Sequence, residues 1–66
     1  RMNFKKGQLV KHRDNPNWKA VVLRDLNPRK PVNSCVVVNH NGGERVMGKS
    51  LLRPDLLAEM EKEFNW

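Results

Sequence analysis

The chain has 66 residues, of which 38% are hydrophobic and 30% charged, and its formal net charge is +6. A chain of this length buries only about 60% of the surface that its unfolded form exposes, which limits it to one marginally stable domain and excludes a parallel-sheet nucleotide-hydrolysing domain. It has a single cysteine and no apolar stretch near the ~20 residues of a membrane span, and its first residues lack the apolar region by which a signal peptide is recognised, so we expect a cytoplasmic protein without membrane contact.

Three strands separated by turn-forming residues are predicted in the first part of the chain. Residues 8–12 form the first, and the turn formers of residues 14–17 separate it from the second, at residues 18–24. Residues 27–33 are expected to be a loop, because neither a helix nor a central strand accommodates two prolines three residues apart. The β-branched run of residues 35–39 predicts the third strand.

A tight hairpin is expected to join the third strand to a fourth at residues 44–47. Asn41-Gly42 is a strong two-residue turn, because both positions tolerate a positive φ. Residues 43–50 also match the phosphate-loop pattern G-x-x-x-x-G-K-[ST]. We predict the hairpin instead, since the four middle residues include no glycine and Pro54 would interrupt the helix that a phosphate loop requires. Replacing Lys49 by alanine is then expected to leave folding nearly intact.

The end of the chain predicts a brief fifth strand around Leu51-Leu52 and then a helix that opens at Pro54-Asp55, with proline at its first position. Leu57, Met60 and Phe64, together with Leu56, form one apolar stripe. A helix this short is marginal alone in water, so it must dock on something. We expect it to pack on its own domain, and the alternative is the groove of a partner protein.

Charge is distributed unevenly along the chain. Residues 1–54 carry twelve Lys or Arg against three Asp or Glu, whereas residues 55–66 carry one against four. A basic body followed by an acidic tail favours a polyanion or an acidic protein surface as the partner.

The strand pattern resembles a known fold family. The segments that carry the resemblance are Gly7-Gln8-Leu9-Val10, the long second strand Trp18 to Arg24, and the terminal Leu51-Leu52 turn. This pattern is similar to small SH3-like barrels of the Tudor and KOW type over residues 4–54. The resemblance implies a mostly β fold: a small SH3-like barrel of four to five antiparallel strands at residues 1–54, followed in the same single domain by a C-terminal α-helix at residues 55–66.

No arrangement of residues predicts catalysis or a resident metal. His12, His40 and Cys35 lack the spacing of a zinc site, and Cys35 and His40 would lie on opposite faces of one strand. Asp14 and Asp25 are too far apart to suggest an acid–base pair. We therefore expect no enzyme, no cofactor and no metal, and we expect Cys35 to be a buried structural thiol.

The basic residues give the functional hypothesis. A small barrel can gather such side chains on one rim, and a rim that neutralises phosphates binds nucleic acid with little sequence preference. Trp18 is expected to anchor the core, with stacking on a base as the alternative. The candidate contacts to nucleic acid or a partner are Lys5, Lys6, Lys11, Arg13, Trp18, Lys19, Arg29, Lys30, Arg45 and Lys49, with Arg24 and Arg53 as further basic positions; Leu57, Met60 and Phe64 are the candidates for helix packing or a partner groove.

The sequence thus predicts a small basic non-catalytic binding module that binds nucleic acid through a rim of Lys and Arg side chains. The alternative is a protein-protein adaptor, regulator or inhibitor, of a bacterial or phage type, that docks on a larger complex. Self-association into a homo-oligomer is compatible with both hypotheses.

Overall fold

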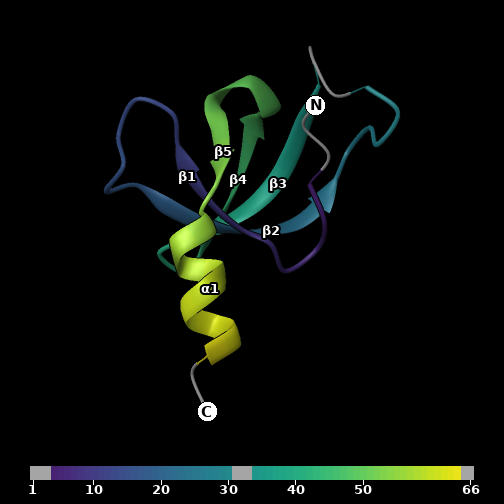
Figure 1. Ribbon diagram of the computed structural model, residues 1–66. Coiled ribbons are helices and arrows are strands. Elements are labelled where there is room, and N and C mark those ends of the chain that lie inside the picture. Colours follow the sequence, from purple (N-terminus) through teal and green to yellow (C-terminus); the bar gives the residue numbers. More distant parts are fainter. Residues whose placement is uncertain (1–3, 31–33, 65–66) are drawn as a thin grey trace.

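The computed structural model describes residues 4–30 and 34–64, with side chains up to residue 61. Five antiparallel strands form one sheet and a helix follows them (Figure 1), so the fold is mostly β, as predicted. The elements are β1 (Leu9–His12), β2 (Lys19–Asp25), β3 (Cys35–His40), β4 (Gly43–Gly48), β5 (Leu52–Pro54) and α1 (Leu56–Phe64), with a 3-10 turn at Lys49–Leu51 between β4 and β5. None of the helical segments described is long and apolar enough to cross a membrane.

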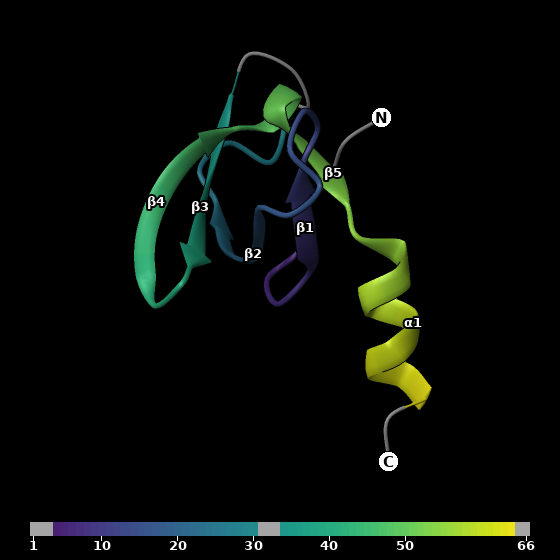
Figure 2. The same ribbon diagram turned by 90° about the vertical axis from the view of Figure 1, so that its left-hand side faces the viewer.

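The strands are arranged in the order β4-β3-β2-β1-β5. The first four strands each pair with the next along the chain, and β5 returns to lie beside β1. The sheet is strongly bent (Figure 2), with β4 at one edge and β5, followed by α1, at the other. In the described part of the chain these two edge strands are not paired with each other, so the sheet is curved but not closed into a barrel by its hydrogen bonds.

Local sequence explains the hairpin and the bend of the sheet. Asn41 and Gly42 have φ angles of 52° and 84°, as a tight turn between twisted strands requires. The Gly42 N–H donates to Asn39 Oδ1 at 3.0 Å, which holds the turn further. The pairing of β2 with β3 shifts register between Val22 and Arg24, and a bulge of this kind bends a strand and increases its twist.

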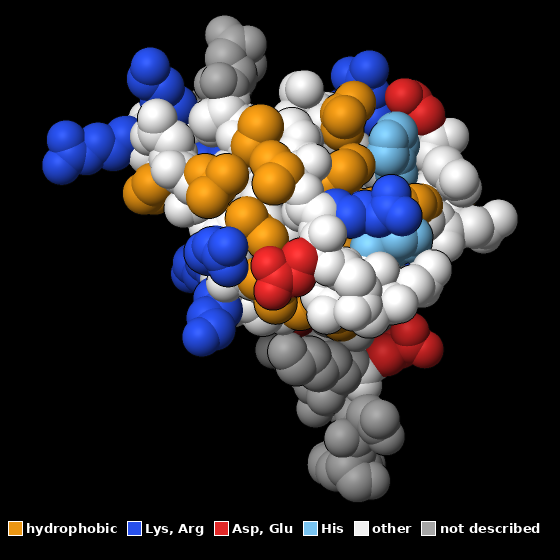
Figure 3. All heavy atoms as spheres, turned by 180° about the vertical axis from the view of Figure 1, so that it is seen from behind, with side chains coloured by type: hydrophobic (Ala, Val, Ile, Leu, Met, Phe, Trp, Pro, Cys, Tyr) orange, Lys and Arg blue, Asp and Glu red, His pale blue; other side chains and the backbone are white. Residues whose placement is uncertain are grey.

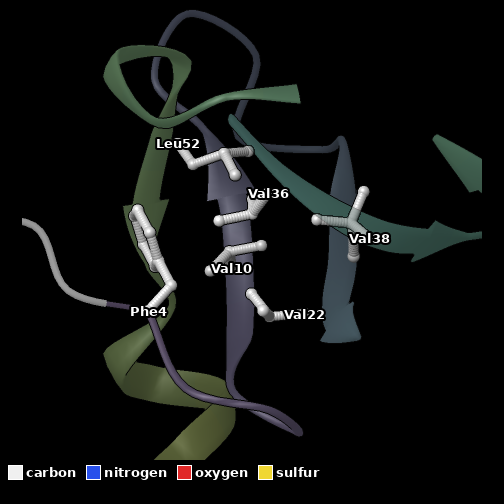
Figure 4. Close-up of a cluster of buried hydrophobic side chains, with 7 residues drawn as sticks. Phe4, Val10, Val22, Val36, Val38 and Leu52 are labelled. Atoms are coloured by element: carbon white, nitrogen blue, oxygen red, sulfur yellow. The ribbon is translucent and has the colours of Figure 1, made fainter. Parts of the chain in front are cut away.

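A small apolar core fills the concave side of the sheet (Figure 4). β1 and β5 supply one side chain each and β2 and β3 two each, together with Phe4, and Trp18 and Met47 pack against this cluster. The buried members are Phe4, Val10, Ala20, Val22, Val36, Val38 and Leu52. A core made mostly of valine leaves little reserve of stability in a chain of this size.

The passage from β5 to α1 differs from the prediction at Pro54. Pro54 is the last residue of β5, paired with Val10, rather than the first residue of the helix. A proline lacks an N–H, so the end of an edge strand accommodates it. Asp55 instead caps the helix, because its Oδ1 accepts the Ala58 N–H at 3.2 Å.

Candidate functional site

Three cationic side chains lie in one row across three neighbouring strands. Lys11 of β1 is directly opposite Lys19 of β2 on one side and Arg53 of β5 on the other. Directly opposite residues of antiparallel strands project from the same face, so the three charges stand side by side. Neighbouring strands are about 4.8 Å apart, and the row therefore spans about 10 Å. We call Lys11, Lys19 and Arg53 the cationic row.

The cationic row is only partly neutralised by the protein itself. Lys19 Nζ lies 3.4 Å from Oδ2 of the buried Asp55, too poorly oriented to count as a hydrogen bond. The Arg53 guanidinium donates from Nη1 to the carbonyls of Ser50 and Leu52, at 3.1 and 2.9 Å. Among the described residues, Lys11 forms no ion pair. Like charges placed opposite each other on a sheet repel and are destabilising. The cationic row therefore lowers the stability of the fold, and a bound anionic ligand would offset this repulsion.

The sequence suggested each of these three basic residues but not their alignment. Arg53 belongs to a segment far along the chain from Lys11 and Lys19, and only the return of β5 beside β1 brings it into register with them. Alternation along each strand would have placed Lys11 and Lys19 on a solvent face, but the register between strands cannot be obtained from alternation alone.

Trp18 lies at one end of the core, between two histidines. Its ring stacks on that of His40 with centroids 4.3 Å apart and planes at 18°, and the ring of His12 meets it edge-on at 5.9 Å. The indole is half-buried and packs against the core cluster, which agrees with its predicted role as a core anchor. One indole face is already occupied by His40, so only the remaining exposed part is available for a base.

His40 is therefore part of this cluster and not the simple solvent-facing residue that its place beside the turn suggests. Its Nδ1 lies 2.9 Å from the Lys19 carbonyl, which can only accept, so Nδ1 carries a proton. Its Nε2 is 3.3 Å from the Asn41 amide nitrogen. Residues 12, 18 and 40 come from separate segments, and no spacing in the sequence indicates that they meet.

Lys49, a predicted surface contact, is fully buried. Its ammonium group has three acceptors for its three N–H groups: Asp25 Oδ2 at 2.8 Å, the Asn27 carbonyl at 2.8 Å and the Lys30 carbonyl at 2.9 Å. Lys49 therefore cannot bind a nucleic acid or a nucleotide phosphate in this fold. This geometry argues against the prediction that Lys49→Ala leaves folding nearly intact, since the change would leave the Asp25 carboxylate, whose side chain is only 10% exposed, without its counter-charge.

The other predicted contacts are dispersed and do not form one rim. Arg13 is exposed and its Nε is 3.1 Å from Asp14 Oδ2. Lys5 and Lys6 lie before β1, beside a hollow of about 450 Å³ near the start of α1. Arg29 and Lys30 are exposed in the proline loop, which is described only as far as residue 30, and Arg45 is exposed on edge strand β4.

The apolar stripe of α1 faces solvent where its side chains are described. Leu56, Leu57 and Met60 are 68%, 74% and 52% exposed. The helix contacts β1 through its polar side: the Leu9 N–H donates to Glu59 Oε1 at 2.7 Å, and the Asp55 N–H donates to the Leu9 carbonyl at 2.9 Å. The expectation that Leu57 and Met60 pack on their own domain is therefore wrong. The side chain of Phe64 lies outside the described residues.

The described residues form no metal site. No group of three or more His, Cys, Asp or Glu side chains is placed to hold an ion within residues 4–30 and 34–61. Cys35 is half-buried at the start of β3, more accessible than the buried thiol that we expected.

No family model, curated protein or solved structure matches the chain closely enough to show a relationship. The geometry of the cationic row and of the exposed helix therefore carries the functional argument.

Proposed function

We propose that this protein binds nucleic acid through the phosphate backbone, with the cationic row as the central contact. The single observation that carries the proposal is the register of Lys19, Lys11 and Arg53 on one face of three adjacent strands. A nucleic-acid strand carries one phosphate for roughly each 3.4 Å of helix axis, so a row about 10 Å long faces several of them.

Charge and shape support a contact of low sequence specificity. The body of the chain is strongly basic, with twelve Lys or Arg against three Asp or Glu in residues 1–54. Lysines bind phosphates as point charges, and contacts of this kind position a protein on a backbone without reading bases. Asp55 offsets part of the charge of Lys19, which leaves Lys11 and Arg53 as the two strongest contacts.

The test is fluorescence anisotropy with labelled single- and double-stranded DNA and RNA at several salt concentrations. With about three to five phosphate contacts, we expect affinity to fall by roughly 40- to 500-fold between 50 and 200 mM salt. The double variant Lys11→Gln with Arg53→Gln should weaken binding for all sequences alike and reduce the slope by about two.

A charge-matched control locates the site. Arg29→Gln with Lys30→Gln removes the same two charges from the proline loop and should have the smaller effect. Equal losses in the two double variants would indicate a diffuse electrostatic attraction and not a site on the row. If the protein fails to bind any of the four nucleic acids at 50 mM salt, the proposal is lost.

We also infer that the protein has the fold of the small SH3-like barrels. The inference rests on the bent five-stranded meander in which β5 returns beside β1. A high-resolution experimental structure would test it, through the hydrogen bonds that link or fail to link the two ends of the sheet.

A second candidate function is docking on another protein, as an adaptor or regulator. The exposure of Leu56, Leu57 and Met60 on one short helix favours it, because contiguous exposed apolar surface is a mark of protein interfaces. Retention of one defined protein from a nuclease-treated lysate, lost in a Leu57→Glu variant, would support this function.

A further inference from the structure

A second row of side chains lies beside the cationic row on the same face of the sheet. Leu9 of β1 is directly opposite Val21 of β2, which is directly opposite Asn39 of β3. Asp55 extends this row beyond Leu9, because its N–H donates to the Leu9 carbonyl at 2.9 Å. Leu9 and Val21 are each two positions from a lysine of the cationic row, so the two rows are about 7 Å apart. We call Asp55, Leu9, Val21 and Asn39 the floor row.

The floor row forms the bottom of a shallow hollow of about 320 Å³, which we call the Asp55 hollow. Ala58 of α1 bounds it on one side, and the turn at Asn41-Gly42 bounds it on the other. Figure 2 shows β1 and β2 between α1 and this turn. Lys19 lines the hollow too, so the hollow adjoins the cationic row. An apolar middle with polar groups at its ends, in a volume of about 300 Å³ or more, is typical of a small-ligand site.

A buried carboxylate oxygen in this hollow lacks a hydrogen-bond donor. Asp55 is only 3% exposed. Its Oδ1 accepts the Ala58 N–H, but its Oδ2 accepts no hydrogen bond from the described residues. Lys19 Nζ approaches Oδ2 to 3.4 Å, on a side chain that is 60% exposed. A buried acceptor without a donor is unfavourable, so this oxygen indicates a ligand that brings an N–H group into the hollow.

The charge around the Asp55 hollow disfavours a cationic ligand. The three cations of the cationic row stand beside it, and the whole chain has a net charge of +6. Lys and Arg side chains also project around the face of the molecule seen in Figure 3, so the field of the protein attracts anions. The N–H donor therefore belongs to a neutral group on a molecule that is negatively charged elsewhere. A nucleotide has this character, with a neutral base and an anionic phosphate.

We propose that the Asp55 hollow holds one unpaired base of a single strand while the adjoining phosphates lie on the cationic row. This inference rests on the function proposed above and names its ligand as single-stranded. The face of the base covers Leu9 and Val21, and Lys19 stands between the carboxylate and the phosphate. A duplex exposes the edges of its bases but not their faces, so it cannot fill the hollow in this way.

The free oxygen of Asp55 also distinguishes between bases. Carboxylates accept from the amino group of cytosine, whereas thymine has a carbonyl oxygen at the same position of a ring of the same size. A carboxylate repels that carbonyl oxygen. We therefore expect cytosine to be preferred over thymine at this one position, while the phosphate contacts remain indifferent to sequence.

The test is fluorescence anisotropy at low salt with three labelled single strands about eight nucleotides long, a common site size. The strands consist of deoxycytidine, of thymidine and of abasic sugar-phosphate, and they carry the same charge. The wild type should bind the deoxycytidine strand about tenfold more tightly than the thymidine strand, the effect of one hydrogen bond to a charged acceptor. The abasic strand should bind more weakly still. Free deoxycytidine monophosphate at about 1 mM should not displace the strand, because its one phosphate meets only part of the cationic row.

Three variants locate the contact. Asp55→Asn keeps an oxygen that caps α1 but replaces Oδ2 by an amide N–H₂ group, so the preference for cytosine over thymine should disappear. Asp14→Asn removes the same charge from an exposed carboxylate outside the hollow and should keep the preference. Ala58→Leu fills the hollow from the helix, where leucine is well tolerated, and should reduce binding of the deoxycytidine strand to that of the abasic strand. Circular dichroism checks that each variant is folded.

The outcomes separate this inference from the proposed function. Binding that weakens with salt but is equal for all three strands overturns the base site and leaves the phosphate contact standing. Failure to bind any strand removes both. A folded Asp55→Asn or Ala58→Leu variant with the wild-type preference for cytosine overturns the assignment to the Asp55 hollow, and displacement by the free monophosphate would show a site for free nucleotides and not for a strand.

Discussion

The ammonium group of Lys49 lies 2.8 Å from the carboxylate of Asp25, in the interior of the protein. Asp25 ends β2, and Lys49 begins the turn between β4 and β5, so the ion pair ties two distant parts of the chain together. The same ammonium group binds the carbonyls of Asn27 and Lys30 and so holds the start of the proline loop. The lysine of the phosphate-loop pattern is therefore a structural residue.

We predict that Lys49→Ala unfolds the protein or nearly does so. Removing one partner of a buried ion pair costs about 3–5 kcal/mol, which is about the whole stability of a domain this small. Lys30→Ala, an exposed charge in the same loop, should cost little, and Lys49→Met with Asp25→Leu should recover part of the loss. Urea denaturation measures all three, and a Lys49→Ala variant with the wild-type midpoint would refute the structural role.

Magnesium with ATP or GTP should not stabilise the protein. A bound nucleotide at a hundredfold excess over its Kd would contribute about 2.7 kcal/mol, which differential scanning fluorimetry readily detects. We expect no shift because all three N–H groups of Lys49 are already bonded and residues 43–48 form a strand. A shift in melting temperature that depends on magnesium and nucleotide would show that residues 43–50 do bind phosphate.

Glu59 is predicted to hold α1 against the sheet. β5 ends before it can pair with the Leu9 N–H, which donates to Glu59 Oε1 instead. A hydrogen bond to a charged acceptor is worth about 1.5–3 kcal/mol. Glu59→Ala should reduce helix content and speed amide exchange at Leu9, both measured by NMR. Glu61→Ala, an exposed acid on the same helix, is the control, and equal effects of the two variants would argue against an anchoring role.

Gly42→Ala should destabilise the protein by about 1 kcal/mol. The left-handed conformation costs an L-residue about 1–2 kcal/mol, and the loss of freedom in the unfolded chain offsets part of it. No heavy atom lies within 4 Å of a Cβ built at Gly42, so the effect is purely conformational. At Gly43 such a Cβ would be 3.7 Å from the His40 carbonyl and φ is not positive, so Gly43→Ala should be nearly neutral. Chemical denaturation should rank the variants in this order.

Lys11→Thr should stabilise the folded protein while it weakens nucleic-acid binding. Lys11 stands between Lys19 and Arg53, and removing repulsion between opposite like charges is worth about 0.2–1 kcal/mol. Salt screens the same repulsion, so the gain should shrink between low and high ionic strength. Lys6→Thr, an exposed lysine outside the strands, is the comparison in thermal melts. A destabilised Lys11→Thr variant would mean that repulsion within the row is negligible.

The sequence alone determined which segments become strands and turns. The Asn41-Gly42 turn, the β-branched run of β3 and the prolines that bound the second loop are local features, and local φ/ψ preferences decide them. The strand bounds moved by only one or two residues between prediction and structure. The helix was also foreseeable, apart from its start, where pairing with Val10 keeps Pro54 in β5.

Tertiary structure decided everything that depends on which residues meet. The sequence pattern around Lys49 predicts a surface charge. Only the tertiary contact between the end of β2 and the turn after β4 places the Asp25 carboxylate and two backbone carbonyls within hydrogen-bond distance of its ammonium group. The apolar stripe of α1 indicates an interface but not its location, because the choice between the helix's own sheet and another surface is made by packing. Likewise, the cationic row exists only because β5 pairs with β1 in one register, and register is a property of the assembled sheet.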